Sequence, residues 1–300
     1  MKFLTGLLAA SLSASSLFAQ ETLAQDSYVL AKKDVTLPLK QKFRAIRLMT
    51  MNDAQVKIEL GSQQIEGLVT HSNIEEILYD FVSENEIRVR FEKNRSLEKS
   101  VMRGQESKNE RVSPAEGKLV ILTQKAGKWA GKLAEGEVPE AEREAFDQAL
   151  TSLIDEFNGG NEAKLYGTEP RKIGESWEVD PALMPGMNFF DIKGGKLKIT
   201  FAEITKFQGE QCAVLNMAFS IKAEMRQEGM QGMGTLIEGS SRVVRSLERL
   251  ADYQFTGKMR MNMAGETEVQ PGLSAKMLMQ GDMKIEMGMT KLGAPDEKAE

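Results

Sequence analysis

Apolar and polar residues alternate along most of the chain, in runs separated by turn residues. Alternation with a period of two is typical of a strand that buries one face. In the first half of the chain, such runs predict strands at 28–39, 43–51, 55–60, 86–93 and 118–124. In the second half, they predict strands at 172–181, 197–207, 211–225, 234–248, 252–263 and 274–290. The run 74–82 fits a helix or a strand, and the charged stretch 103–117 predicts an exposed loop.

Residues 139–160 follow a different pattern. Phe146, Leu150 and Leu153 recur at helical spacing, Pro139 stands at the start, and a glycine pair stands at the end. We therefore predict a mainly β (α+β) protein: an antiparallel, meandering sheet or half-barrel with one central amphipathic helix. Its parts are an N-terminal β half at 25–135, the helix at 139–158, a C-terminal Met-rich β half at 163–292 and a disordered tail at 293–300.

The N-terminus has the pattern of a secretory signal peptide. Lys2 precedes an acid-free apolar run rich in Leu, Ala and Ser, and cleavage fits after Ala19 or as late as Ala24. The alternative of a membrane anchor is disfavoured by the shortness of the run and its many small and hydroxyl residues. No later segment is apolar enough to span a bilayer. The sequence thus predicts a bacterial periplasmic or secreted protein without a transmembrane segment after signal removal.

Cysteine content and charge narrow the class further. Cys212 is the only cysteine, so the mature chain can form no internal disulfide and should not be a lipoprotein. We expect this thiol to be a buried small hydrophobe. The formal net charge is -5, whereas a protein that binds duplex nucleic acid usually presents a basic face. No nucleic-acid partner is predicted.

The sequence offers no motif that supports an enzyme. His71 is the only histidine, so a zinc site built from several histidines is impossible. Its surroundings, VTHSN, resemble a turn, and we expect an exposed or capping residue there. Gly-x-Ser-x-Gly, His-Glu-x-x-His and phosphate-loop motifs are missing, and no cofactor is predicted. A hydrolase that uses two carboxylates stays an alternative, because Asp and Glu are plentiful.

Methionine is concentrated in the C-terminal third. Twelve of the 18 methionines lie between residues 217 and 289. Met259, Met261 and Met263 alternate with polar residues, and Met283 and Met287 share their alternation with Ile285. Because isoleucine cannot bind a metal, this pattern selects apolar bulk, either for a dry core or for the lining of an apolar cavity.

Two further candidates lie outside this pattern. Met230 and Met233 stand among glycines in the stretch 228–234, where exposed thioethers could bind copper. Trp177 could stack on a ligand or anchor the core at the start of a strand.

The segment around Trp177 also carries a family likeness. With KIGESWEVDP at 172–181 and the strands that follow, the C-terminal half resembles an uncharacterised family of exported bacterial β-rich proteins with a Lys-x-Gly-Glu-Ser-Trp-like signature. The resemblance implies an exported β-rich fold and supplies no site.

The leading hypothesis is an exported, non-enzymatic binding or envelope-associated protein. It would hold an apolar or lipid-like small molecule in a Met-lined cavity formed by Met259, Met261, Met263, Met283, Met287 and Trp177. The alternatives are a periplasmic copper-handling protein that uses Met230 and Met233, and the carboxylate hydrolase.

Overall fold

A computed structural model describes residues 26–293, except for 33–36, 159–160, 185–186, 188–189, 227–232 and 271–272. The predicted signal peptide at 1–19, residues 294–300 of the predicted tail and Met230 lie outside the described residues.

The N-terminal half of the fold is a series of antiparallel strands followed by a helix. These elements are β1 (Ser27–Tyr28), β2 (Lys42–Leu60), β3 (Gln63–Ser83), β4 (Glu86–Met102), β5 (Gln105–Val112), β6 (Leu119–Lys125), β7 (Lys128–Leu133) and α1 (Glu140–Asn158). The helix spans nearly the predicted range, because its apolar face and its terminal breakers are both local features of the sequence.

The C-terminal half begins with short elements and continues with long strands. They are α2 (Asn161–Tyr166), β8 (Arg171–Lys172), β9 (Ser176–Val179), the 3-10 helix η1 (Pro181–Leu183), β10 (Phe190–Phe207), β11 (Glu210–Met225), β12 (Gly234–Ser246), β13 (Asp252–Gln270) and β14 (Leu273–Lys291). The short helix α2 was not predicted.

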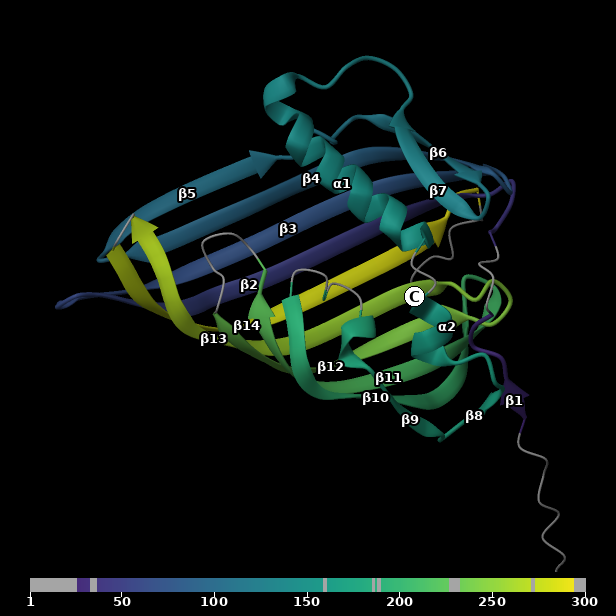
Figure 1. The fold of residues 1–300 in the computed structure, drawn as a ribbon. Coiled ribbons are helices and arrows are strands. Elements are labelled where there is room, and N and C mark those ends of the chain that lie inside the picture. The colour runs from purple at the N-terminus through teal and green to yellow at the C-terminus, as the bar shows by residue number, and fades with distance from the viewer. Residues whose placement is uncertain are drawn as a thin grey trace, which may run out of the picture.

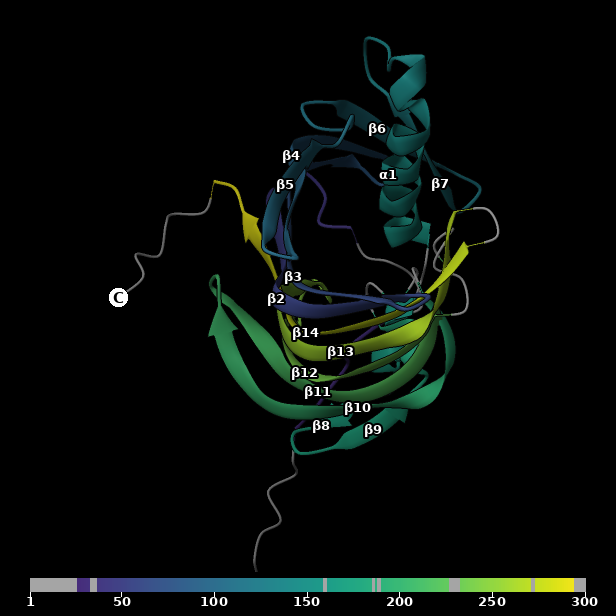
Figure 2. The same ribbon diagram turned by 90° about the vertical axis from the view of Figure 1, so that its left-hand side faces the viewer.

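All strands except β1 and β8, which pair with each other, form one antiparallel sheet. Its order is β7-β6-β4-β3-β2-β14-β13-β12-β11-β10-β9, and β5 pairs with β4. The last strand, β14, lies beside β2, so the two β halves join into a continuous surface (Figure 1). The sheet curls until β4 and β5 lie across from β10 and β11 (Figure 2). This open, curved sheet with its helix confirms the predicted half-barrel-like, mainly β fold.

The structure corrects or decides four local predictions. Among the described residues of the predicted strand 28–39, which exclude 33–36, only Tyr28 is paired, although Leu30 and Ala31 are buried in the core. The stretch 103–117 contains β5, whose residues are all exposed, so no apolar alternation revealed it. The run 74–82 is a strand, and the runs 43–51 and 55–60 form one strand that is interrupted by a bulge at Asn52 and Asp53.

The concave side of the sheet, called here the inner face, carries two hydrophobic cores. One core lies under α1 and contains Phe43, Tyr79, Val89, Phe146 and Leu153. The other lies over β10 to β13 and is covered by Leu165 and Tyr166 of α2 together with Met184, Met187 and Met233. The convex outer face carries exposed ion pairs such as Arg260 with Asp282. The part of the inner face between the two cores is less covered than the cores themselves.

A fully buried arginine fastens the second core. Arg245 on β12 donates from Nε to the carbonyl oxygen of Leu30 at 2.6 Å, from Nη1 to Asp252 at 2.5 Å and from Nη2 to Glu162 of α2 at 2.6 Å. Its guanidinium stacks on Tyr166 at 4.3 Å from the ring centre. A buried charge is tolerated only when it is paired and hydrogen-bonded. This one residue therefore ties the N-terminal segment, α2, β12 and β13 together.

We predict that Arg245→Ala lowers the free energy of unfolding by about 3–5 kcal/mol, because it leaves Asp252 and Glu162 without their buried partner. Urea unfolding followed by circular dichroism measures this change. Arg242→Ala is the matched control, because Arg242 lies on the same strand but is 48% exposed and pairs with Glu203 at 3.7 Å. Its loss should cost less than about 1 kcal/mol. Equal effects of the two substitutions would contradict the role of Arg245.

Candidate functional site

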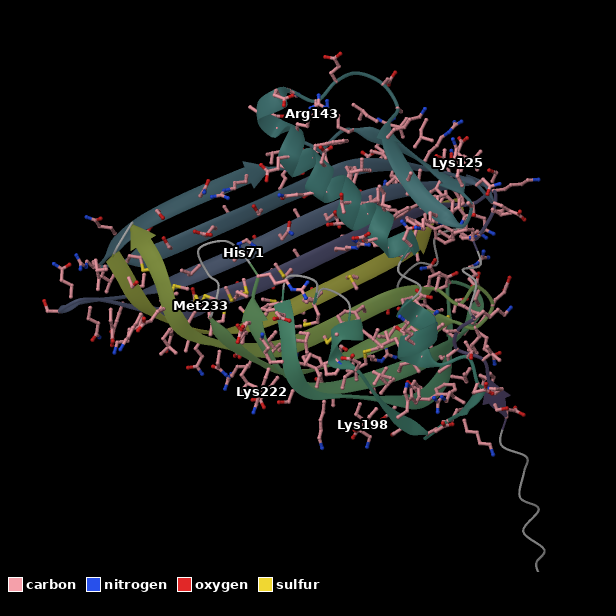
Figure 3. The ribbon with its side chains drawn as sticks, viewed as in Figure 1. His71, Lys125, Arg143, Lys198, Lys222 and Met233 are labelled. Atoms are coloured by element: carbon pink, nitrogen blue, oxygen red, sulfur yellow. The ribbon has the colours of Figure 1, made fainter. Side chains whose placement is uncertain are left out.

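Methionines from three neighbouring strands lie together on the inner face. The register pairs Met259 with Met283, Met263 with Met279 and Phe255 with Met287 between β13 and β14. It then pairs Met283 with Met51 and Ile285 with Met49 between β14 and β2. Directly paired residues of an antiparallel sheet point to the same face. Figure 3 shows sulfur atoms gathered along this face, around the labels of His71 and Met233.

These methionines differ in how far they are covered. Met259, Met261 and Met263 are 6%, 7% and 2% exposed and belong to the core beneath α2. On strands β14 and β2, the methionines are half-buried except for Met51, which is buried. We call the following set the methionine floor: Met49, Met51, Met277, Met279, Met283 and Met287. The methionines of β13 thus act as core, while most of the floor borders open space.

Two hollows of the described surface lie away from the floor. One hollow lies along the exposed side of α1, and a second lies between β2, β3 and β14 and is lined by Lys57, Leu68 and Leu278. Neither contains a floor methionine. These two hollows therefore lie apart from the floor, whose methionines line the concave inner face of the sheet.

Polar side chains adjoin the floor on the next strands of the sheet. Three rows show the change, each read from β14 through β2 and β3 to β4. They are Met283–Met51–His71–Glu98, Ile285–Met49–Asn73–Ser96 and Met287–Arg47–Glu75–Asn94. We call His71, Asn73, Glu75, Asn94, Ser96 and Glu98 the polar wall. All are half-buried except Glu98, which is exposed. The inner face is thus amphipathic, and its polarity changes mostly between β2 and β3.

His71 does not occupy the exposed or capping turn that the sequence predicted. It lies in the middle of β3, half-buried, between Met51 and Glu98 (Figure 3). The stretch VTHSN looked like a turn because it is polar, but its polarity reflects the open part of the inner face that it lines. Only the pairing of β3 with β2 could place this histidine beside methionines.

Met233 also differs from the prediction. It is fully buried against the core beneath α2, and its carbonyl oxygen accepts a hydrogen bond from the backbone N–H of Met225 at 3.2 Å. Its glycine neighbours suggested exposure, but packing against β10 to β13 determines its position. Cys212 is fully buried, as predicted.

Trp177 lies on β9, at the far edge of the sheet, and β10 to β13 separate it from the floor. Its indole N–H donates to the carbonyl oxygen of Leu165 at 3.0 Å, and the guanidinium of Arg171 covers its ring at 4.6 Å. Arg171 also pairs with Glu175, and Gly174 adopts a φ of +87° in the turn between them. The KIGESW segment thus forms a compact corner that packs Trp177 against the second core, and Trp177 does not lie beside the methionine floor.

An ion-pair network marks the boundary between α1 and the polar wall. Arg47 on β2 donates to Glu75 at 3.0 Å and to both carboxylate oxygens of Glu156 on α1 at 2.6 and 2.7 Å. Burial raises the pKa of Glu75, and the attraction of Arg47 opposes that rise. Burial and the nearby Glu156 raise the pKa of Tyr79, whose hydroxyl faces Glu156 at 3.5 Å. This network holds the end of α1 against β2 and β3.

Acidic and thiol groups do not assemble a metal centre. Within the described residues, no three His, Cys, Asp or Glu side chains gather where they could hold a metal ion. None of the described helices is both long enough and apolar enough to cross a membrane.

The solved structures that resemble this chain include distant likenesses. No protein family matches the chain, and no curated protein matches its sequence. Lipovitellin, solved in a study of its lipid–protein interactions, is 8% identical with a TM-score of 0.35; the match covers 86% of this chain and 26% of lipovitellin. The chain therefore spans about a quarter of lipovitellin's length.

Two smaller structures are also similar. A β-barrel-like protein of the domain of unknown function DUF1849 from Brucella abortus is 11% identical with a TM-score of 0.19, over 80% of this chain and 95% of that one. A putative outer membrane lipoprotein-sorting protein domain from Vibrio parahaemolyticus is 7% identical with a TM-score of 0.16, over 83% and 87%. At these scores, none of the likenesses carries an argument about function.

The raised pKa of Glu75 predicts a pH-dependent effect of Glu75→Gln. Folding favours the protonated carboxyl of Glu75. Its contribution to the free energy of unfolding is therefore complete below the unfolded pKa of 4.5 and is lost as the pH rises through the folded pKa. Glutamine is neutral throughout. The stability of the variant relative to the natural protein should therefore increase as the pH rises above 4.5 and become constant above the folded pKa of Glu75, as measured by urea unfolding. A difference that does not change with pH would refute this prediction.

Proposed function

We propose that this chain is an exported, non-enzymatic binding protein that holds an amphiphilic, lipid-like molecule against the methionine floor. The supporting observation is the cross-strand gradient, in which half-buried thioethers on β14 and β2 adjoin half-buried polar groups on β3 and β4. The apolar part of the ligand lies on the floor, and its polar headgroup lies on the wall.

The chemistry of the floor suits such a ligand. Methionine is unbranched and polarizable, so a surface of methionines adapts to chains of different shape. A contiguous apolar surface that borders open space usually marks a binding site in a soluble protein. The wall supplies amide and hydroxyl groups from Asn73, Asn94 and Ser96, and such convergent polar groups orient a ligand in an otherwise apolar site.

Export belongs to the same proposal. It rests on the signal-like residues 1–19, with Lys2 before an acid-free apolar run. A protein that carries a poorly soluble molecule through an aqueous compartment needs an apolar surface that is shielded on one side, and the outer face with its ion pairs meets the solvent on the other.

The direct test is ligand occupancy. Native mass spectrometry and organic extraction of the protein purified from its expression host should detect a co-purified amphiphile. Titration of the delipidated protein with a fluorescent fatty acid should show saturable binding. A protein that carries no lipid and takes up no probe would overturn the proposal.

Paired substitutions on one strand locate the binding surface. Met283→Glu places a charge on the floor and should weaken probe binding at least about tenfold, because the apolar chain would then bury an unpaired charge. Leu278→Glu is the matched control: Leu278 is 48% exposed on the outer face of the same strand. It should leave binding unchanged. Equal affinities of the two variants would place the ligand elsewhere.

A substitution in the wall tests the orientation of the ligand. Asn73→Leu removes hydrogen-bonding groups beside Met49 and should cost about 0.5–1.5 kcal/mol of binding free energy for an amphiphile with a hydroxyl headgroup. A purely aliphatic probe should bind no more weakly than to the natural protein. Competition titrations with both ligands measure the difference. A loss that is equal for both would contradict the proposed orientation.

A further inference from the structure

The sole histidine of the chain lies in the same row as three methionines. The register runs from Met259 on β13 to Met283 on β14, then to Met51 on β2 and His71 on β3. All four side chains leave the sheet on its inner face. Side chains that leave a concave face converge, so neighbours in such a row approach one another more closely than on a flat sheet.

The backbone is irregular at this row. After Met51, Asn52 and Asp53 lie opposite the single residue Thr70 of β3, and Asp53 has a φ of +48°. The hydroxyl of Thr70 accepts a hydrogen bond from the backbone N–H of Asp53 at 3.2 Å and donates one to the carboxylate of Asp53 at 3.1 Å. These two bonds hold the bulge in place. Bulges are frequent next to functional sites, where they redirect a side chain.

On the other side of β2, strand β14 approaches β2 closely at the same row. A Cβ atom at Gly281 of β14 would lie 2.7 Å from the Cβ of Ala54 and 3.3 Å from the Cγ of Met51. Glycine therefore lets β14 come close to β2 two residues before Met283. The bulge and the glycine thus both lie at Met51, which stands between Met283 on β14 and His71 on β3.

The donor atoms of this row are thioether sulfur and imidazole nitrogen, and none of them is a hard oxygen donor. Thioether sulfur is a soft ligand and imidazole is borderline, a combination that selects Cu(I) over hard cations such as Mg²⁺ or Ca²⁺. Among the described residues, the side chain of His71 makes no hydrogen bond or ion pair. His71 and Met283 are half-buried and Met51 is 7% exposed, so the donors are partly withdrawn from solvent at the border between the floor and the polar wall.

We propose that Met51, Met283 and His71 form a binding site for a single Cu(I) ion on the inner face. The site uses donors other than Met230 and Met233, and it does not depend on lipid binding. The metal is held by two sulfur atoms and one imidazole nitrogen, and the neutral donors leave the ion its positive charge. The open side of the polar wall admits the ion.

The test is anaerobic titration of the purified, delipidated protein with Cu(I) in competition with a chromophoric Cu(I) chelator. The natural protein should withdraw one equivalent of copper per chain. His71→Ala, Met51→Leu and Met283→Leu should each weaken binding at least about tenfold, since even the loss of an outer partner of a metal ligand costs 10–100-fold. Met217→Leu is the control: Met217 is a buried methionine of β11 outside the row and should bind copper as before.

A second readout distinguishes a ligand from a merely structural residue. Because His71 is the only histidine, its imidazole gives a single set of NMR signals, which Cu(I) or redox-stable Ag(I) should shift in the natural protein and in Met217→Leu. Unchanged imidazole signals, no competition with the chelator, or equal behaviour of Met283→Leu and Met217→Leu would overturn the site. None of these results bears on uptake of a fluorescent fatty acid, so the two proposals can fail separately.

Discussion

The antiparallel pairing of β14 with β2 is the contact on which the rest of this structure depends. It joins the last strand of the chain to the first strand of the large sheet, over fifteen register pairs from Lys276 with Glu59 to Lys291 with Phe43. Because side chains alternate between the two faces of a sheet, a shift of one residue would move every floor methionine of β14 to the outer face. The observed register instead brings Met283 beside Met51, and both proposed sites follow from that placement.

The two cores divide the inner face and leave its middle available. The helix α1 covers the end near β6 and β7, and α2 with the nearby loop residues covers β10 to β13. Each cover is fastened by a charged network: Arg47 with Glu75 and Glu156 on one side, and Arg245 with Asp252 and Glu162 on the other. Breaking the network of the fully buried Arg245 is costly. The pair of Arg47 with Glu156 is partly exposed and contributes less. The middle of the inner face thus lies between the core under α1 and the core under α2, and its own surface is made of adaptable side chains.

Much of the fold could be predicted from local sequence patterns. The alternation at 211–225 and 274–290 predicted long strands, and the spacing of Phe146, Leu150 and Leu153 predicted the helix. In any segment that buries one face, the apolar residues repeat with the period of the strand or helix. The exposed strand β5 escaped prediction, since neither of its faces is buried. Met233 was placed wrongly because its glycine neighbours carry information about the backbone and none about what packs above it.

The sequence by itself determined that the methionines of β13 and β14 point to one face, and that the chain has a central amphipathic helix. It also excluded a zinc site of several histidines and gave no basis for a nucleic-acid partner. Only the tertiary structure decided which methionines are core and which border open space, and that His71 lies beside Met51. The physical reason is that strand alternation is a property of neighbouring residues in the chain, whereas burial and cross-strand neighbours depend on pairing between segments far apart in sequence.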